Sequence, residues 1–240
     1  MKPQKMSFVF DFDGVLWQTR RMMEKLDDSL TRLGVLQNTK DIFPLYNKWK
    51  QIPSNQRGTF VEGFPQWLAQ QEHIRGKEYD VTALTSLVCE ISGGNWVHPN
   101  AAEVLAQLPK EQIFVVTCGD TEGQKKKLIT SGLVGRYLDW SRIRIVSQKN
   151  ETAFRLAVTE MGIVGPIVHI NDRLDELQIG LRAFPNGIPV WLGDRTGEEY
   201  GFRGKEMDQL FGIRHEQLPN CLHIFDLAEL PGALRQQRLL

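Results

Sequence analysis

The residues best able to do chemistry follow four short apolar runs of the sequence. These segments are Asp11-Phe12-Asp13-Gly14, Thr117-Cys118-Gly119-Asp120, Ser147-Gln148-Lys149 and Asn171-Asp172. In an open α/β sheet ligands bind outside the carboxyl ends of the strands, so these side chains are expected to converge on one crevice. Carboxylates packed that closely need a cation between them, and their hard oxygens suit Mg²⁺. A lysine and a hydroxyl beside the metal suit the oxygens of a phosphate.

The first of these segments carries the most specific pattern. Asp11 and Asp13 are two residues apart on extended chain, so their side chains can share one face. One carboxylate can then attack while the other handles a proton. Asp-Phe-Asp-Gly alone is also ordinary turn chemistry at a strand end. The apolar strand before it and Gly14-Val15-Leu16 after it favour the functional interpretation.

The other segments leave alternatives open when each is taken alone. Asp172, with Asp175 and Glu176, also fits a helix cap followed by first-turn acids. Lys149 also fits a solvated lysine beside a cap at Asn150. The lysine run at 125–127 is typical of a solvated helix face, and His169, inside an apolar strand, of a core histidine.

Strands and helices alternate along most of the chain. Unbroken apolar runs predict strands over 8–10, 113–116, 143–146, 167–170, 188–192 and 221–225. Amphipathic segments between them predict helices over 101–108, 122–131, 151–161 and 174–183. This order predicts an α/β fold with a doubly wound parallel sheet. The stretch from 17 to 96 reads as helical and predicts an inserted α-helical cap domain, which leaves 1–16 and 97–240 as the core domain.

The four segments, in this order, resemble the motifs of the haloacid dehalogenase (HAD) superfamily of hydrolases. Phe10 to Leu16 is similar to the first motif, Thr117 to the second, Lys149 to the third, and Asp172 with Glu176 to the fourth. The resemblance implies a Rossmann-like core with a cap inserted after the first motif. It also implies that Asp11 is the nucleophile that forms an aspartyl-phosphate.

The same resemblance assigns the remaining roles. Asp13 is implied as general acid/base, and Thr117 and Lys149 as the groups that hold the phosphoryl group. Cys118 follows Thr117 directly, so it is expected to flank the substrate site with its side chain pointing the other way. Mg²⁺ is implied to bind Asp11, the backbone carbonyl of Asp13 and Asp172, with Glu176 reaching it through water. An acid at position 13 favours phosphoryl transfer, because the dehalogenases of the family lack it.

Two residues depart from the family pattern. Asn171 stands where Gly or an acid is usual, so it is expected to support the site rather than to bind metal. Gln18 replaces the acid often found after the first motif in sugar-phosphate mutases. The resulting prediction is a Mg²⁺-dependent phosphatase of small phosphate monoesters. The alternatives are a phosphomutase and a non-catalytic protein that binds a phosphate ligand or a partner.

Composition narrows the possible partners and location. The chain has 29 basic and 29 acidic residues, which argues against binding of nucleic acid or of an anionic membrane. Three widely spaced cysteines and the lack of an apolar leader are expected of a cytoplasmic protein. The sequence leaves a monomer and a homodimer open. Arg57, in the polar 54–59 stretch of the cap, is expected to bind a second anionic group on the substrate.

Overall fold

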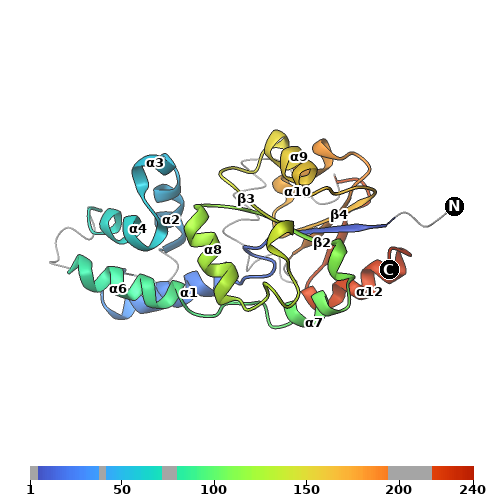
Figure 1. Ribbon diagram of the computed structural model, residues 1–240. Helices are drawn as coiled ribbons and strands as arrows, with labels where there is room; N and C mark the ends of the chain where they lie inside the picture. The colour runs from blue at the N-terminus through green and yellow to red at the C-terminus, as the bar shows by residue number, and fades with distance from the viewer. Residues whose placement is uncertain (1–4, 38–41, 72–79, 194–217) are drawn as a thin grey trace.

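A six-stranded parallel sheet forms the centre of the computed structural model, which describes residues 5–37, 42–71, 80–193 and 218–240 (Figure 1). The strands are β1 (Ser7–Phe10), β2 (Ile113–Cys118), β3 (Ile143–Val146), β4 (Ile167–Asn171), β5 (Ile188–Leu192) and β6 (Leu222–Ile224). Their order is β3-β2-β1-β4-β5-β6, and each neighbouring pair is parallel. The predicted doubly wound α/β core is therefore confirmed.

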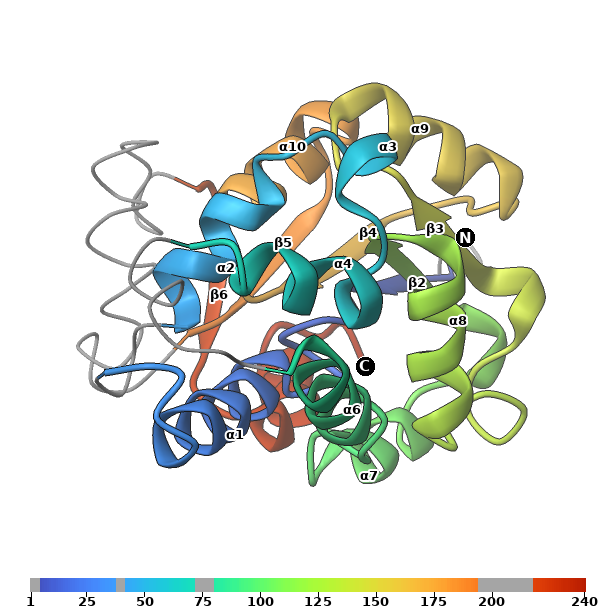
Figure 2. The ribbon, with the colours of Figure 1, turned by 90° about the vertical axis from the view of Figure 1, so that its left-hand side faces the viewer.

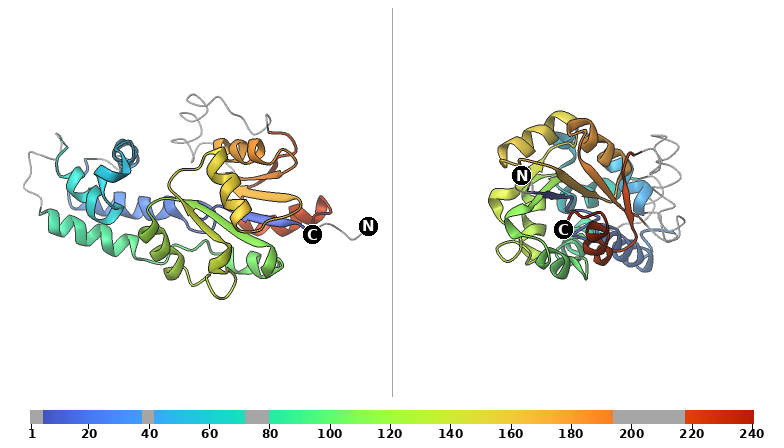
Figure 3. Two further views of the ribbon diagram at one scale, coloured as in Figure 1. Left: turned by 45° about the horizontal axis from the view of Figure 1, so that its top comes forward. Right: turned by 90° about the vertical axis from the view of Figure 1, so that its right-hand side faces the viewer.

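Helices cover both faces of this sheet (Figure 3). The core helices are α7 (Ala101–Ala106), α8 (Thr121–Thr130), α9 (Glu151–Glu160), α10 (Leu174–Ala183) and α12 (Leu230–Gln236), with short 3-10 turns at Lys110–Gln112, Trp140–Arg142 and Leu227–Glu229. Phe8 and Phe10 of β1 pack in the cluster that includes residues of α7, α8 and α12. Val9, between them, packs with residues of α9 and α10. Successive residues of β1 thus serve opposite faces, as the pleat of a strand requires.

The segment between β1 and α7 folds as helices with a hydrophobic cluster of their own (Figures 1 and 2). These helices are α1 (Thr19–Arg32), α2 (Ile42–Lys50), α3 (Ser54–Arg57), α4 (Phe60–Leu68) and α6 (Val81–Ser92). Met23, Leu26 and Leu30 of α1 recur on one side of the helix and are buried in this cluster. We refer to these helices as the cap.

Two neighbouring segments connect the cap to the sheet. Trp17 forms an antiparallel bridge with Val97. The backbone N–H of Gln18 donates to the carbonyl of Trp96 at 2.6 Å, and that of His98 donates to the carbonyl of Leu16 at 2.9 Å. These contacts fasten the entry to the cap to its exit, directly after the loop that carries Asp11 and Asp13.

No helix of the described residues combines the length and the apolar character needed to span a membrane. The stretch from 193 to 218, which is long for a plain connection, lies outside the described residues except for its two end positions.

Candidate active site

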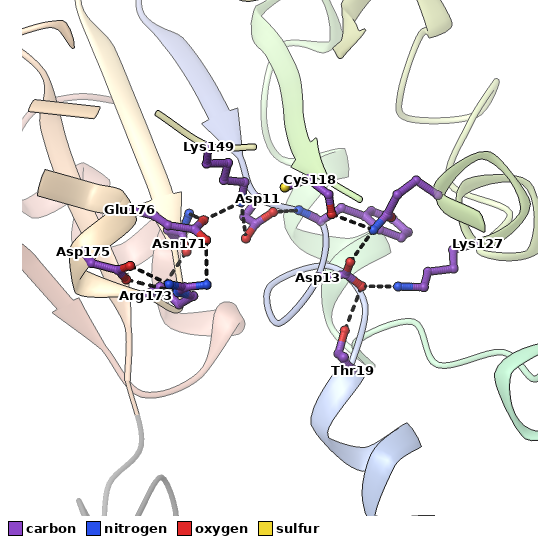
Figure 4. Close-up of polar contacts among 12 residues, drawn as sticks. Asp11, Asp13, Thr19, Cys118, Lys127, Lys149, Asn171, Arg173, Asp175 and Glu176 are labelled. Atoms are coloured by element: carbon purple, nitrogen blue, oxygen red, sulfur yellow. Dashed lines mark hydrogen bonds and ion pairs between the residues drawn. The ribbon is translucent and has the colours of Figure 1, made fainter. Parts of the chain in front are cut away.

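Asp11 follows β1 directly, and its carboxylate lies among charged groups at the carboxyl end of the sheet (Figure 4). The residue is 3% exposed. Its Oδ1 accepts from the backbone N–H of Phe12 at 2.7 Å, and its Oδ2 lies 2.6 Å from Nζ of Lys149. The same ammonium lies 2.5 Å from Oε2 of Glu176. Lys149 therefore bridges two buried carboxylates.

The charged groups around Asp11 have opposing effects on its pKa. Burial raises the pKa of the Asp11 carboxyl to about 8, a rise that the Lys149 charge opposes and the nearby Glu176 and Asp172 carboxylates increase. Burial alone would lower the pKa of Lys149, but Asp11 and Glu176 more than offset it and raise that pKa above its ordinary value. Lys149 is thus a buried cation, and the alternative of a solvated lysine beside a cap is wrong.

Glu176 is held by several donors besides Lys149. The amide of Asn171 donates to its Oε2 at 3.0 Å, and Nη1 of Arg173 lies 3.1 Å from its Oε1. Against the effect of burial, these partners lower the pKa of Glu176 to about 2. The sequence places Glu176 near the metal through water. In the structure both of its oxygens are engaged by protein donors, so we assign Glu176 to positioning Lys149.

Asp172 lies against the loop that carries the first motif. A Cβ added to Gly14 would stand 2.1 Å from Oδ2 of Asp172, so only glycine leaves room for this carboxylate. The backbone φ of Gly14 is +88°, which also favours glycine. Helix α10 has Arg173 as its cap residue, and Oδ1 of Asn171 accepts from the Arg173 N–H at 2.9 Å. The alternative that Asp172 is only the helix cap is therefore wrong.

Asp13 belongs to a second network, separate from that of Asp11 (Figure 4). Its Oδ1 accepts from Oγ1 of Thr19 at 2.8 Å and lies 2.7 Å from Nζ of Lys127, while its Oδ2 accepts from Nε2 of Gln124 at 2.6 Å. Burial acts against the charge, but Lys127, Gln124 and Thr19 together lower the pKa of Asp13 to about 2. Asp13 is held as a carboxylate.

Lys127 and Gln124 are site residues that the sequence did not indicate. Lys125 and Lys126 are exposed, as expected of a solvated helix face, but for Lys127 that expectation is wrong. On an α-helix, residues three apart lie on one face, which brings Gln124 and Lys127 of α8 to Asp13 together. Leu128, directly after Lys127, is buried, a contact that the lysine run itself does not indicate.

Thr117 and Cys118 end β2 beside Asp11. Thr117 is fully buried, and its Oγ1 has no hydrogen-bond partner among the residues that the structure describes. A buried hydroxyl without a partner is costly, so its position points to a ligand. The Sγ of Cys118 donates to the carbonyl of Ser147 at 3.4 Å, and its backbone carbonyl accepts from Gln124 at 3.0 Å. Cys118 thus contacts the Asp13 network through its carbonyl and the segment before Lys149 through its thiol.

The contacts that the structure shows for Arg57 lie within the cap. Its Nη1 donates to the backbone carbonyl of Lys50 at 2.7 Å, and its guanidinium lies over the Trp49 ring, 5.1 Å from the ring centre. Both partners belong to α2. These contacts assign Arg57 to the end of α2 within the cap.

The donors near Asp11 fit a divalent cation. Among the described residues no three Asp, Glu, His or Cys side chains form a group that could hold a metal ion. Yet the Asp172 carboxylate is packed against Gly14 and its charge, with that of Glu176, raises the pKa of Asp11. A cation would relieve this repulsion, and carboxylate and carbonyl oxygens suit Mg²⁺.

Behind Lys149, His169 of β4 is buried against an aromatic ring. The ring centres of His169 and Phe154 are 4.8 Å apart, and the Nδ1 of His169 has no hydrogen-bond partner. Burial, with the nearby Lys149 charge, lowers the pKa of His169 to about 3. His169 is a neutral core residue, as the sequence predicts.

This burial predicts a pH dependence of stability. Between pH 6.5 and 5 the unfolded chain takes up a proton at His169 and the folded chain does not, so stability falls as pH falls. We expect urea denaturation to show a loss of about 1.4 kcal/mol per pH unit that His169→Leu removes. Asp11, with its raised pKa, contributes the opposite slope in both proteins, so the difference between them isolates His169. Equal slopes in the two proteins would contradict the assignment.

Comparison with known structures gives the same fold. A HAD-family hydrolase of Deinococcus radiodurans R1 with bound phosphate and sodium has a TM-score of 0.61 and 20% identity, covering 98% of this chain and 96% of that chain. A HAD-hydrolase of Bacillus subtilis bound to magnesium has 0.63 and 17%, covering 97% and 99%. An L-2-haloacid dehalogenase of Xanthobacter autotrophicus with covalently bound chloropropionic acid has 0.62 and 14%, with the same coverage. At these identities the likeness shows the fold alone.

The family follows from the sequence itself. No curated protein matches the chain at a significant level. The family model described as haloacid dehalogenase-like hydrolase matches residues 6–183, which span all four motif segments. The chain belongs to the haloacid dehalogenase-like hydrolase family.

Proposed function

We propose that this hydrolase is a Mg²⁺-dependent phosphatase that cleaves small phosphate monoesters through an aspartyl-phosphate. The observation that carries the proposal is the division between Asp11 and Asp13. Two residues apart, they lie in separate networks: Asp11 contacts Lys149, whereas Asp13 contacts Lys127, Gln124 and Thr19. Carboxyl groups with such different environments are suited to different roles in one reaction.

The proposed reaction has two displacements at phosphorus. An Asp11 oxygen attacks phosphorus, the bond to the ester oxygen breaks, and Asp13, which takes up a proton from solvent for this step, passes it to that oxygen. Water then attacks the aspartyl-phosphate, Asp13 takes a proton from it, and Asp11 is released with inorganic phosphate. Because Lys127, Gln124 and Thr19 stabilise the ionised form of Asp13, its surroundings favour the proton-accepting role.

Residues around Asp11 would bind the phosphoryl oxygens. Lys149 supplies a fixed positive charge, and Thr117 supplies a buried hydroxyl. Asp11, the backbone carbonyl of Asp13 and Asp172 would hold Mg²⁺, with Glu176 keeping Lys149 in place. The metal would supply charge that offsets the repulsion between the phosphoryl group and these carboxylates.

Thr117 offers a test that separates binding from folding. Its hydroxyl has no partner in the folded protein, so Thr117→Val is expected to leave the melting temperature unchanged or to raise it slightly. Loss of a hydrogen bond to the phosphoryl group should lower kcat/KM on the order of 10-fold or more, whereas Thr117→Ser should keep most of it. A melting temperature that falls in parallel with activity would place Thr117 in the core only.

An assay with p-nitrophenyl phosphate tests the proposed function. Release of p-nitrophenol that requires Mg²⁺ and stops with EDTA supports a phosphatase. The wild-type protein should also be given 2-chloropropionate, because a structural relative carries chloropropionic acid. Chloride release without phosphate hydrolysis would assign a dehalogenase. Phosphate transfer to a second sugar phosphate would assign a mutase, and no turnover of any substrate would favour a binding protein.

A further inference from the structure

The cations around the two carboxylate networks are already paired within the core. Lys127 pairs with Asp13, Lys149 with Asp11 and Glu176, and Arg173 with Asp175 and Glu176. These groups surround the phosphoryl end of a substrate. A group that reads the remainder of the molecule should therefore come from the cap, which faces this edge of the sheet (Figure 2).

The last turn of α2 presents two such side chains. Tyr46 and Lys50 are four residues apart, so they lie on one face of the helix. Nζ of Lys50 is 5.5 Å from the centre of the Tyr46 ring, a cation–π contact. The Tyr46 ring packs edge-on against Phe60, at 5.4 Å between centres. The lysine thus extends from a fixed aromatic support.

A second contact fixes the end of this helix. The carbonyl of Lys50 accepts from Nη1 of Arg57 at 2.7 Å, and the Arg57 guanidinium lies over the Trp49 ring. A cation at the last carbonyls of a helix is favourable because those groups carry partial negative charge. Arg57 therefore holds the position from which the Lys50 side chain starts.

The same face of α2 lies within electrostatic range of the site. Burial raises the pKa of the Cys118 thiol, and Lys50 is one of two lysines whose charges oppose that rise, the other being Lys149. Tyr46 is among the groups that raise the pKa of Lys127, the partner of Asp13. Lys50 is thus close enough to the end of β2, and Tyr46 to the partner of Asp13, for their charges to act on these groups.

Lys50 itself remains available for a ligand. Its side chain is exposed, and within the parts of the chain that the structure describes it has no carboxylate partner. This contrasts with Lys127 and Lys149, which are both ion-paired. A cation without a partner, held beside a site for a phosphoryl group, suits a second negative charge on the same molecule.

We propose that Lys50 determines substrate specificity by binding an anionic group, a carboxylate or a second phosphate, on the alcohol side of the phosphate ester. The inference rests on the proposed phosphatase function and names its substrate class. Tyr46 and Arg57 are positioning residues that hold the lysine over the site.

Matched phosphate esters test this assignment. The probes are phosphoglycolate, which carries a carboxylate, 2-hydroxyethyl phosphate, which is similar in size but neutral there, and 1,3-propanediol bisphosphate. Wild type should favour at least one anionic probe over the neutral one in kcat/KM. Lys50→Met should lower kcat/KM for that probe on the order of 10- to 100-fold and leave the neutral probe unchanged. Lys50→Arg should keep most of the preference.

Lys48→Met is the matched control, because Lys48 is an exposed lysine two residues away and so on another side of α2. It should leave the preference unchanged. Turnover of all probes without a preference, or equal losses on all of them in Lys50→Met, would overturn this inference and leave the phosphatase standing. Absence of Mg²⁺-dependent turnover on these probes and on p-nitrophenyl phosphate would refute the proposed function and this inference with it.

Discussion

Asp11→Asn is expected to lower turnover of p-nitrophenyl phosphate by on the order of 10⁴-fold or more while the fold survives. An amide is too weak a nucleophile to form the acyl-phosphate, but it keeps an acceptor for the Phe12 N–H. Lys149 loses one partner and keeps Glu176. Because burial disfavours the charge of Asp11, the melting temperature in EDTA should stay the same or rise. Steady-state kinetics and thermal denaturation measure the two effects.

Asp27→Asn is the matched control for this variant. Asp27, in the cap, is as buried as Asp11, at 3% exposure, and its Oδ1 accepts from the Ile42 N–H at 3.0 Å. The same chemical change there should leave kcat within a few-fold of wild type. Activity of Asp11→Asn within tenfold of wild type would exclude Asp11 as nucleophile, once mass spectrometry shows that the new amide has not hydrolysed back to the acid.

The central strands β1, β2 and β4 could be predicted closely because they are buried on both faces. Runs such as that at 113–116 are continuously apolar, which is typical of a central parallel strand, and β2 begins at the same residue. Helix starts were also readable where a side chain caps the helix. Asn150 accepts from the Ala153 N–H at 2.9 Å, and α9 begins directly after it.

The cap was predictable as helical but not in its details. Pro44 and Pro65 lie inside helices α2 and α4, although proline usually interrupts a helix. Pro44 is in the first turn of α2, where a missing N–H costs nothing. Pro65 lies deeper in α4, and its burial in the cap cluster accounts for its tolerance there. Packing within the cap therefore outweighs the tendency of proline to interrupt a helix.

The site residues that escaped prediction depend on long-range contacts. Lys127 is 114 residues from Asp13, and a lysine run gives no sign of which member turns inward. Lys149 and Asp172 were predictable because they lie within a few residues of strand ends, which must meet at one edge of the sheet. The sequence suggested that Arg57 was available to bind substrate. Its partners in the structure are a backbone carbonyl and the face of a ring, and such contacts leave no pattern in a sequence.

Lys149→Met is expected to destabilise the protein by about 3–5 kcal/mol at pH 8 in EDTA, because it removes the cation between two buried carboxylates. Without that charge the pKa of Asp11 should rise further, so the folded protein holds a proton that the unfolded chain releases. Stability then falls as pH rises, and the loss should be smaller at pH 5.5 than at pH 8. Urea denaturation at both pH values measures it.

A double variant identifies the cause of this loss. Adding Asp11→Asn to Lys149→Met removes one of the two facing carboxylates. The double variant should therefore regain part of the lost free energy of unfolding, and the regained part should be largest at pH 8. Mg²⁺ should raise the melting temperature of Lys149→Met more than that of wild type, because a cation bound by Asp11 and Asp172 replaces part of the positive charge that Asp11 has lost. Lys126→Met, at an exposed lysine, should change neither quantity. A loss in Lys149→Met that is independent of pH and unrelieved by the double variant would mean that Lys149 stabilises the protein through packing of its chain rather than through its charge.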